Sequence, residues 1–524
     1  MVGVSPPLQD FWGTFAHSYQ RAGILQALAW VQRQGHRGYG QPGGRLSGAI
    51  LRWPTGSGKS FAAAQVAEAL ARPTVFITPA HCRLQLAGAL THFTGIPTMA
   101  YLPQSKRKRG WTELGQQQAE AEAQGAPPWF VLGWSNVVTD GKLLPELAMF
   151  LAEYPDALVV LDEVHHMADH RMSKALAGAD GRDAYAPITS TAAVMRRALR
   201  GMHTGPTLGM SATPSTDRPS QLWGVLDAVQ PFSWGKSRPF RQRYAGLRPP
   251  GPDEYGEVED PTMVTREARA ELRRRMAEVI HSVPYSTIRR YMPPKRYEVF
   301  TIGREDQGPI PRGARRTLKA AQKAQEGLED AELSVAAWVK TPATVARCLE
   351  LLGGGEKILL FTEEVAHAEE LGLRIGKGFS GDLWVGHGGH SAVEREQIRQ
   401  SFIGHPGPCI LVGTRPAWGE GIDLYDASRT ILAALPWTHG DLLQVLGRGP
   451  RLASKRPWVG EFHRAVGTRD DRVFEKIIGR LAELGELLPD EALDAVRDGL
   501  RGTTGAEVLS GMLARFVAQC EGPS

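Results

Sequence analysis

The most constraining feature of the sequence is the heptapeptide at positions 54–60, which reads Pro-Thr-Gly-Ser-Gly-Lys-Ser. The apolar run Ala49–Leu51 precedes it, and the alanine-rich segment Phe61–Ala71, typical of a helix, follows it. A glycine-rich loop that joins a strand to a helix and ends in Lys-Ser is typical of a phosphate-binding loop in an α/β fold. The first position departs from the pattern, because Trp53 stands where glycine or alanine is usual.

The residues of this loop have distinct predicted roles. Gly56 and Gly58 permit a tight turn that directs backbone N–H groups toward phosphate oxygens. Lys59 is predicted to contact the terminal phosphates of ATP, and the hydroxyl of Ser60 is predicted to ligate Mg²⁺. The helix that follows adds its partial positive charge. The other loop residues expected to bind the nucleotide are Thr55 and Ser57.

A second candidate element is the acidic pair Asp162–Glu163, which follows the apolar run Leu158–Leu161. Two acids at the carboxyl end of a buried strand suit a metal-and-water site. Asp162 is predicted to hold Mg²⁺, directly or through water. Glu163 is predicted to orient and deprotonate the attacking water as general base.

Short runs of Val, Ile and Leu separated by helical stretches predict parallel strands that are buried on both faces. The predicted strands are Gly48–Arg52, Thr74–Thr78, Trp129–Leu132, Leu158–Leu161 and Thr207–Met210 in the first half, and Val299–Ile302, Ile358–Phe361, Leu383–Val385, Ile410–Val412 and Thr430–Leu435 in the second. A long polar helical pattern runs from Arg315 to Trp338. The expected fold is α/β, with two doubly wound parallel-sheet lobes.

Composition and length divide the chain further. Its 524 residues are too many for one ordinary core. We expect a first, ATP-binding lobe at 1–245, a linker with a basic helical segment at 246–296, a second lobe at 297–482 and a helical tail at 483–524. The net charge of +5 is compatible with a polyanionic partner, and the stretch Val264–Arg296 holds nine Arg or Lys against three Glu.

Cysteine usage and hydropathy bear on the compartment. The four cysteines are far apart and form no Cys-x-x-Cys pair, so neither a disulfide framework nor a structural zinc site is expected. No apolar stretch is long enough to span a bilayer, and Met1–Gln20 has no signal-peptide pattern. These features predict a cytoplasmic protein with no membrane partner.

Together the motifs resemble those of the superfamily-two helicases, which have two RecA-like lobes. Asp162-Glu163-Val164-His165 matches the family's DExH motif, and Ser211-Ala212-Thr213 matches its Ser-Ala-Thr motif. The resemblance implies that His165, Ser211 and Thr213 couple the nucleotide site to the nucleic-acid track. Gln20 resembles the family's adenine-reading glutamine, and Gln26 is a rival for that role.

The second half carries further family motifs. Thr414 follows a predicted strand, and the segment Gly419–Asp423 reads Gly-Glu-Gly-Ile-Asp. The resemblance implies that Thr414, Gly419 and Gly421 meet the nucleic-acid backbone and that Asp423 approaches the nucleotide. A hydroxyl at a strand end and amides exposed by glycine suit phosphate oxygens.

The segment Gln444–Arg451 matches the family's QxxGRxxR motif at every fixed position. If it is helical, Arg448 and Arg451 share a face. The resemblance implies that this motif, Gln444 included, acts in catalysis and that both arginines reach the γ-phosphate bound on the first lobe. Arginine suits this role because its planar fork binds phosphate bidentately and keeps its charge.

Several stretches outside these motifs resemble the Swi/Snf-type translocases. Examples are Leu222–Leu226 after the third motif, Arg289-Arg290 with Pro293-Pro294-Lys295, and Gly467–Asp471 after Arg451. The phosphate loop departs from the Gly-Leu-Gly-Lys-Thr of that family. The resemblance implies translocation on duplex DNA, driven by ATP and Mg²⁺ and gripped through the DNA backbone.

Other functions stay open at this point. The chain could be a motor subunit that serves a protein partner, such as a nuclease or a replication or recombination complex. It could also be an RNA helicase, because motors that grip the backbone use the same motifs for both nucleic acids. A binding module with an inactive site is disfavoured by the intact Lys59, Asp162, Glu163, Arg448 and Arg451.

Overall fold

The computed structural model divides the chain into two compact units, Met1–Val283 and Pro284–Ser524, here called the first and second lobes. It describes residues 17–33, 47–101, 123, 125–168, 173–176, 184–187, 190–212, 214, 220–249, 258–324, 327–418, 424, 426–436, 442, 445–446, 454, 456–475 and 477. Each lobe is built on its own parallel β-sheet, as the sequence predicts.

The first-lobe sheet has the strand order β13-β1-β10-β7-β2-β4-β3, and every pair of neighbours is parallel. Its strands are β1 (Gly48–Arg52), β2 (Thr74–Thr78), β3 (Met99–Ala100), β4 (Trp129–Gly133), β7 (Leu158–Asp162), β10 (Thr207–Met210) and β13 (Ile280–Ser282). β1, β2, β4 and β10 are buried along their whole length, which explains their continuous apolar sequences. The carboxyl ends of β1, β10, β7 and β2 therefore lie next to one another.

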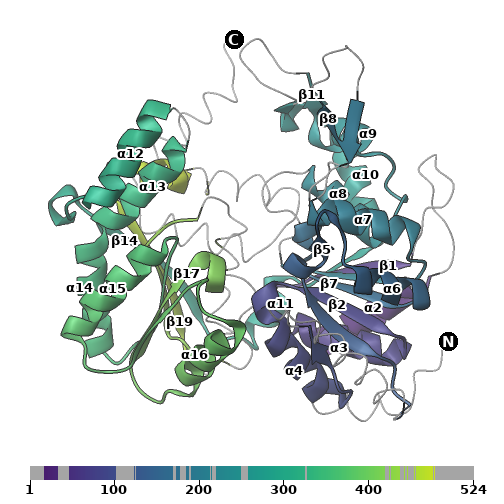
Figure 1. Cartoon of the computed structure of the whole chain (residues 1–524), viewed down its shortest axis with the longest axis horizontal. Coiled ribbons are helices and arrows are strands. Elements are labelled where there is room, and N and C mark those ends of the chain that lie inside the picture. The colour runs from purple at the N-terminus through teal and green to yellow at the C-terminus, as the bar shows by residue number, and fades with distance from the viewer. Residues whose placement is uncertain are drawn as a thin grey trace. The chain divides into compact units, whose positions relative to one another are not determined.

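Helices cover both faces of this sheet, and Figure 1 shows α3 and α4 on one side and α7 and α8 on the other. The first-lobe helices are α2 (Ser18–Val31), α3 (Lys59–Leu70), α4 (Arg83–Thr94), α6 (Pro145–Glu153), α7 (Thr191–Gly201), α8 (Gln221–Val229), α9 (Ser237–Ala245) and α10 (Arg266–Met276). Among the described residues of this lobe, three antiparallel strand pairs lie outside the sheet: β5 (Val138–Thr139) with β6 (Lys142–Leu143), β8 (Ser173–Leu176) with β9 (Ala184–Pro187), and β11 (Leu247–Arg248) with β12 (Val258–Glu259).

The segment 246–296, expected to be a linker with basic helices, contributes directly to the first lobe. After α10 the chain forms β13, which pairs with β1 on the side opposite β10. The boundary between the two units follows directly, at Val283 and Pro284. Arg275 explains why a basic helix packs here, since its guanidinium lies 4.3 Å from the ring centroid of Trp234 and donates to the Ser233 carbonyl.

The second-lobe sheet has the order β14-β19-β18-β15-β17-β16, again with parallel neighbours throughout. Its strands are β14 (Lys295–Ile302), β15 (Lys357–Thr362), β16 (Leu383–Gly386), β17 (Cys409–Thr414), β18 (Arg429–Leu432) and β19 (Trp458–Ala465). The described helices are α11 (Tyr285–Arg289), α12 (Arg312–Ala324), α13 (Leu328–Val339), α14 (Thr341–Gly353), α15 (Val365–Gly378), α16 (Ala392–Gly404) and α17 (Arg415–Trp418). Apolar residues of α14, α15, β15, β17 and β18 form the core of this lobe.

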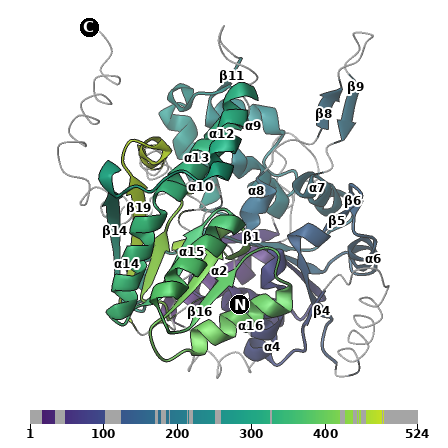
Figure 2. The same ribbon diagram turned by 60° about the vertical axis from the view of Figure 1, so that its left-hand side comes forward.

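The polar pattern from Arg315 to Trp338 forms two helices rather than one. Gly327 separates α12 from α13 with φ +64°, a left-handed conformation that ends a regular helix. The two helices lie side by side in both views (Figures 1 and 2).

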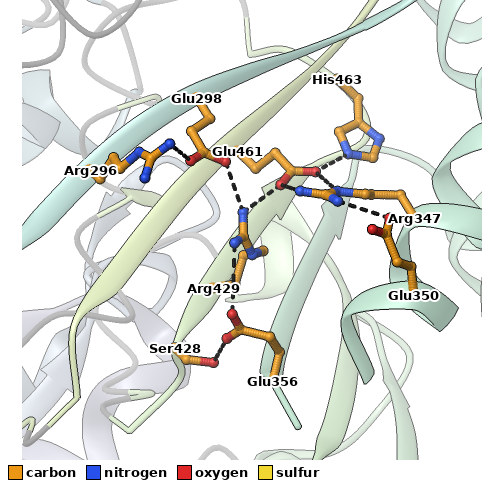
Figure 3. A network of polar contacts seen from close by, with 9 residues as sticks. All are labelled: Arg296, Glu298, Arg347, Glu350, Glu356, Ser428, Arg429, Glu461 and His463. Atoms are coloured by element: carbon orange, nitrogen blue, oxygen red, sulfur yellow. Dashed lines mark hydrogen bonds and ion pairs between the residues drawn. The ribbon is translucent and has the colours of Figure 1, made fainter. Parts of the chain in front are cut away.

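A network of buried charges ties β14, β18 and β19 of the second lobe to α14 (Figure 3). Arg429 donates to Glu298 at 3.2 Å and to Glu461 at 2.5 Å. Glu461 also accepts from Arg347 at 3.2 Å and from Nε2 of His463 at 2.9 Å. Opposite charges are thus matched in the interior, as a buried ionic group requires.

Two further expectations concern the helical tail and membrane-spanning helices. The helical tail expected at 483–524 lies outside the described residues. Among the helices that are described, none combines the length and the apolar character needed to cross a bilayer.

Candidate nucleotide and coupling site

The predicted phosphate loop connects β1 to α3 in the first lobe. Gly56 and Gly58 have φ values of +80° and +89°. In this region a side chain is strained, and at Gly58 a Cβ atom would also come within 2.3 Å of Nε2 of Gln20. Glycine is therefore required at position 58 by the backbone conformation, and a larger residue would also displace the Gln20 amide.

The side chains of Lys59 and Ser57 fold back over the loop. The Lys59 ammonium donates to the carbonyl oxygens of Trp53 at 3.1 Å and Pro54 at 3.4 Å. The Ser57 hydroxyl donates to the same Pro54 carbonyl at 2.6 Å. The lysine charge is thereby held directly over the loop at the amino end of α3, which is the place where phosphate is favoured.

Helix α2 supports the phosphate loop through hydrogen bonds. The Tyr19 hydroxyl and the Gln20 amide both donate to the Ser57 carbonyl, at 2.6 and 3.0 Å. The other end of the Gln20 amide accepts from the backbone N–H of His17 at 2.9 Å. Gln20 is only 3% exposed, so its side chain supports the shape of the loop. Its predicted contact with adenine stays a prediction.

Trp53, the residue that departs from the usual motif, is fully buried. Its indole N–H donates to Nδ1 of His281 in β13 at 2.9 Å. Gly23 of α2 makes room for the ring, because a Cβ atom there would lie 2.2 Å from it. The bulky residue therefore joins the start of the loop to α2 and β13. Burial also lowers the pKa of His281, which suits a ring nitrogen that accepts this hydrogen bond.

The predicted acids lie at the carboxyl end of β7, two strands from β1. Asp162 accepts from the Thr78 hydroxyl of the neighbouring strand β2 at 2.8 Å and from the backbone N–H of Glu163 at 3.1 Å. Burial, followed by the negative charge of Glu163, raises the pKa of Asp162 to about 6. The charge of Lys59 acts in the opposite direction, which shows that the phosphate loop and the acids share one electrostatic site.

Glu163 has an unusual backbone conformation. Its φ of +50° and ψ of +57° lie in the left-handed region, where a residue with a side chain is strained. Such strain costs about 1–3 kcal/mol and is concentrated at functional sites. Here it turns the chain sharply after β7 and directs the Glu163 carboxylate toward β10.

Two residues from the predicted coupling motifs, Ser211 and His165, meet at this carboxylate. The Ser211 hydroxyl donates to Oε2 of Glu163 at 3.3 Å. Nδ1 of His165 lies 3.2 Å from the Ser211 oxygen and 3.4 Å from the same Glu163 oxygen. Side chains thus join the ends of β7 and β10, so a movement of the Glu163 carboxylate directly changes the hydrogen bond of Ser211.

The structure leaves several predicted residues untested. In the second lobe Thr414 is 3% exposed at the end of β17, beside Thr362 of β15. Arg415, the next residue, donates to Glu363 at 2.5 Å. The predicted site residues that lie outside the described part of the chain are Thr213, Gly419, Gly421, Asp423, Gln444, Arg448 and Arg451.

The sequence reasoning did not single out Thr78, Tyr19 or His281 as parts of this site. Thr78 had a usable signal, since it is a polar residue at the end of an otherwise apolar strand whose limits were predicted. Tyr19 and His281 had none, because their positions depend on how α2 and β13 pack beside β1.

Comparison with known proteins supports this description. The helicase conserved C-terminal domain matches residues 343–453. SWI/SNF-related matrix-associated actin-dependent regulator of chromatin subfamily A-like protein 1 is 24% identical over 297 residues in Xenopus tropicalis and 26% identical over 291 residues in Bos taurus. These alignments cover 54% and 53% of this chain, but only 30% and 29% of the relatives. The second lobe thus matches a helicase domain, and about half of the chain is similar to Swi/Snf-type relatives.

A solved structure is similar to this chain in fold. It is described as the ATP-dependent Type ISP restriction-modification enzyme LlaBIII bound to DNA, and it matches with a TM-score of 0.50 and 14% identity. The match covers 90% of this chain and 31% of that protein. The helicase domain match lies in the second lobe, and the phosphate loop lies in the first.

Proposed function

We propose that the chain is an ATP-driven motor that acts on nucleic acid, with duplex DNA as its track. The observation that carries this proposal is the meeting of four elements at one edge of the first-lobe sheet. The phosphate loop follows β1, Ser211 follows β10, the Asp162–Glu163 pair ends β7, and Thr78 ends β2. Such an edge is where ligands bind in open parallel sheets.

In the proposed reaction Lys59 and the amino end of α3 hold the terminal phosphates of ATP. Glu163 accepts the proton of the attacking water, and Ser211 and His165 hold the carboxylate in position. Asp162 and the Ser60 hydroxyl offer the oxygen ligands that Mg²⁺ prefers. The pKa of Asp162 is raised first by burial and then by the charge of Glu163, and a cation bound there would favour the charged carboxylate. Mg²⁺ bound there would neutralise charge on the phosphates.

The nucleic-acid part of the proposal draws on the relatives. The helicase domain matched at 343–453 and the Swi/Snf-type relatives support a motor that grips the backbone. We assign Thr213, Thr414, Gly419 and Gly421 to backbone contact or coupling. Asp423, Gln444, Arg448 and Arg451 are assigned to the nucleotide. Backbone contact implies little sequence preference and a strong dependence on salt.

The experiment that tests the proposal is ATP turnover by the wild type and Lys59→Ala. It is run without nucleic acid and with duplex DNA, single-stranded DNA or structured RNA, at low and at moderate salt. We expect duplex DNA to stimulate the wild type most and the variant to be silent. Stimulation by RNA or single strands alone would contradict a duplex track but keep the motor. A wild type that ignores every nucleic acid would contradict the motor itself.

A second candidate is a motor that serves a separate protein partner. The chain spans about a third of the length of the relatives and of the solved structure that it matches. Co-purification as a stable hetero-complex, with turnover that depends on the partner, would support it. A turnover that duplex DNA alone stimulates fully would argue against it.

A further inference from the structure

Helix α12 of the second lobe carries a continuous row of positive charge. Its cations recur three or four residues apart and all are exposed: Arg312, Arg315, Arg316, Lys319 and Lys323, here called the α12 stripe. At 100° per residue, these positions fall within an arc of about 100°. At 1.5 Å per residue, the row is about 16 Å long.

The opposite side of the helix is the packed side. Ala321 is buried and Ala314 and Leu318 are half-buried, and they lie on the face away from the stripe. Both ribbon views show α12 beside α13 (Figures 1 and 2). The stripe is therefore directed away from the contact that holds the helix.

The stripe has no counter-charge within the part of the chain that the structure describes. α12 itself contains no acid, and none of the five cations forms an ion pair with a described residue. Neighbouring like charges at this spacing destabilise a helix. Of the three acids of α13, Glu329 and Glu332 are paired with Arg469, and Asp330 forms no ion pair with the stripe in the described part of the chain.

The helical pair is fixed to the body of the second lobe. Lys340, between α13 and α14, forms a fully buried ion pair with Asp470 at 2.7 Å. Gln307, just before α12, donates to the Val466 carbonyl at 2.9 Å. Both contacts, and Arg469, belong to the end of β19 and the turn Gly467–Asp471, one of the Swi/Snf-like stretches. A force applied to α12 would thus be transmitted to the β-sheet of the second lobe.

We propose that the α12 stripe binds the phosphate backbone of nucleic acid, at a place separate from the residues supplied by the helicase motifs. The inference rests on the proposed function, because it assigns a second contact to the same track. A regular row of exposed cations without acids matches the regular negative charge of a duplex. Arginine in three of the five positions adds a planar fork that suits phosphate oxygens.

The test compares two double variants of the full-length chain. Arg315→Gln with Lys319→Gln removes two charges from the stripe. Arg374→Gln with Lys377→Gln removes one arginine and one lysine from the exposed side of α15 in the same lobe. Binding of a short duplex is measured by fluorescence anisotropy between about 50 and 200 mM salt, the range over which phosphate contacts lose affinity steeply. Thermal unfolding confirms that all proteins are folded.

For the stripe variant we expect the slope of log affinity against log salt to fall by about two, with affinity reduced on the order of tenfold near 100 mM salt. The α15 variant should match the wild type. Equal slopes and affinities for wild type and stripe variant would overturn the inference, and would favour an acidic protein surface as the partner of the stripe. A wild type that does not bind duplex would instead contradict the proposed function, so the two failures are distinguishable.

Discussion

Buried carboxylates lie in both parallel sheets, but their surroundings differ. In the first lobe Asp162 and Glu163 are adjacent, and the pKa of Asp162 is raised by burial and by its neighbour's charge. In the second lobe burial would also raise the pKa of Glu461. There, contacts with His463, Arg347 and Arg429 outweigh burial and lower the pKa to about 2 (Figure 3).

The difference distinguishes a candidate functional site from a charge network that stabilises the fold. Glu461 has all the positive charge that it needs within the fold, and removing it would leave three cationic or hydrogen-bonding partners unmatched. At Asp162, burial and the charge of Glu163 outweigh the opposing effect of Lys59, and the backbone at Glu163 is strained. That imbalance is a cost to the folded state that a bound cation would relieve.

The comparison is tested most strongly at Glu163. Glu163→Gln keeps the shape of the side chain and an oxygen that accepts from Ser211, but it cannot take up a proton from water. We expect ATP turnover to fall on the order of 10³-fold while the midpoint of urea unfolding changes little. Steady-state phosphate release and binding of a fluorescent nucleotide separate catalysis from affinity. The control is Glu153→Gln, which changes an exposed residue at the end of α6. Undiminished turnover by Glu163→Gln would show that Glu163 is not the general base.

The scaffold side is tested at Glu461. Glu461→Gln leaves Arg347 and Arg429 without their shared anion, so we expect a loss of about 3 kcal/mol in the free energy of unfolding at neutral pH. Glu350→Gln is the matched control, because Glu350 binds the same Arg347 at 2.9 Å from an exposed position. It should cost less than about 1 kcal/mol. Urea titration measures both free energies of unfolding. Equal losses for the two variants would show that the buried network stabilises the fold no more than a surface ion pair does.

The smallest expected effect has the opposite sign and depends on pH. Because the pKa of Asp162 is raised, the folded state retains a proton that the unfolded state has lost between about pH 4 and 6. Stability from this group therefore falls as pH rises through that window. Asp162→Asn should be more stable than the wild type by about 1–2 kcal/mol at pH 7.5 and similar to it at pH 4.

Urea unfolding in chelator at both pH values checks this expectation. Mg²⁺ should then stabilise the wild type at pH 7.5 and leave Asp162→Asn unchanged. Asp156→Asn, which alters an exposed acid of the same lobe, provides the comparison. A constant difference between Asp162→Asn and the wild type across pH would show that the Asp162 charge carries no such cost.

Much of the fold could be predicted because most strands are buried on both faces and read as continuous apolar runs. β19 was missed for the opposite reason: Glu461, His463 and Arg464 interrupt its sequence. Each has a partner outside the strand, and these partners are Arg347, Thr344 and Asp471 respectively. β13 was missed because three residues before Val283-Pro284 give no periodic signal.

The candidate site divides in the same way. The phosphate loop is a local motif, so Gly56, Gly58 and Lys59 were identified from sequence alone. The contact of Thr78 with Asp162 depends on β2 lying beside β7, although β3 and β4 come between them in the chain. Trp53 was recognised only as a departure, and its role required the position of His281 in space.

The late arrival of β13 has a consequence for how the first lobe is made and shortened. β1 carries the phosphate loop, yet its second partner strand is the last part of the lobe to leave the ribosome. Until Ile280–Ser282 has emerged, one side of β1 presents unpaired backbone groups of the kind that recruit foreign strands and lead to aggregation. A fragment intended to hold the first lobe alone should therefore end at Val283, since one that stopped at residue 245 would keep every loop motif but leave β1 at a bare edge.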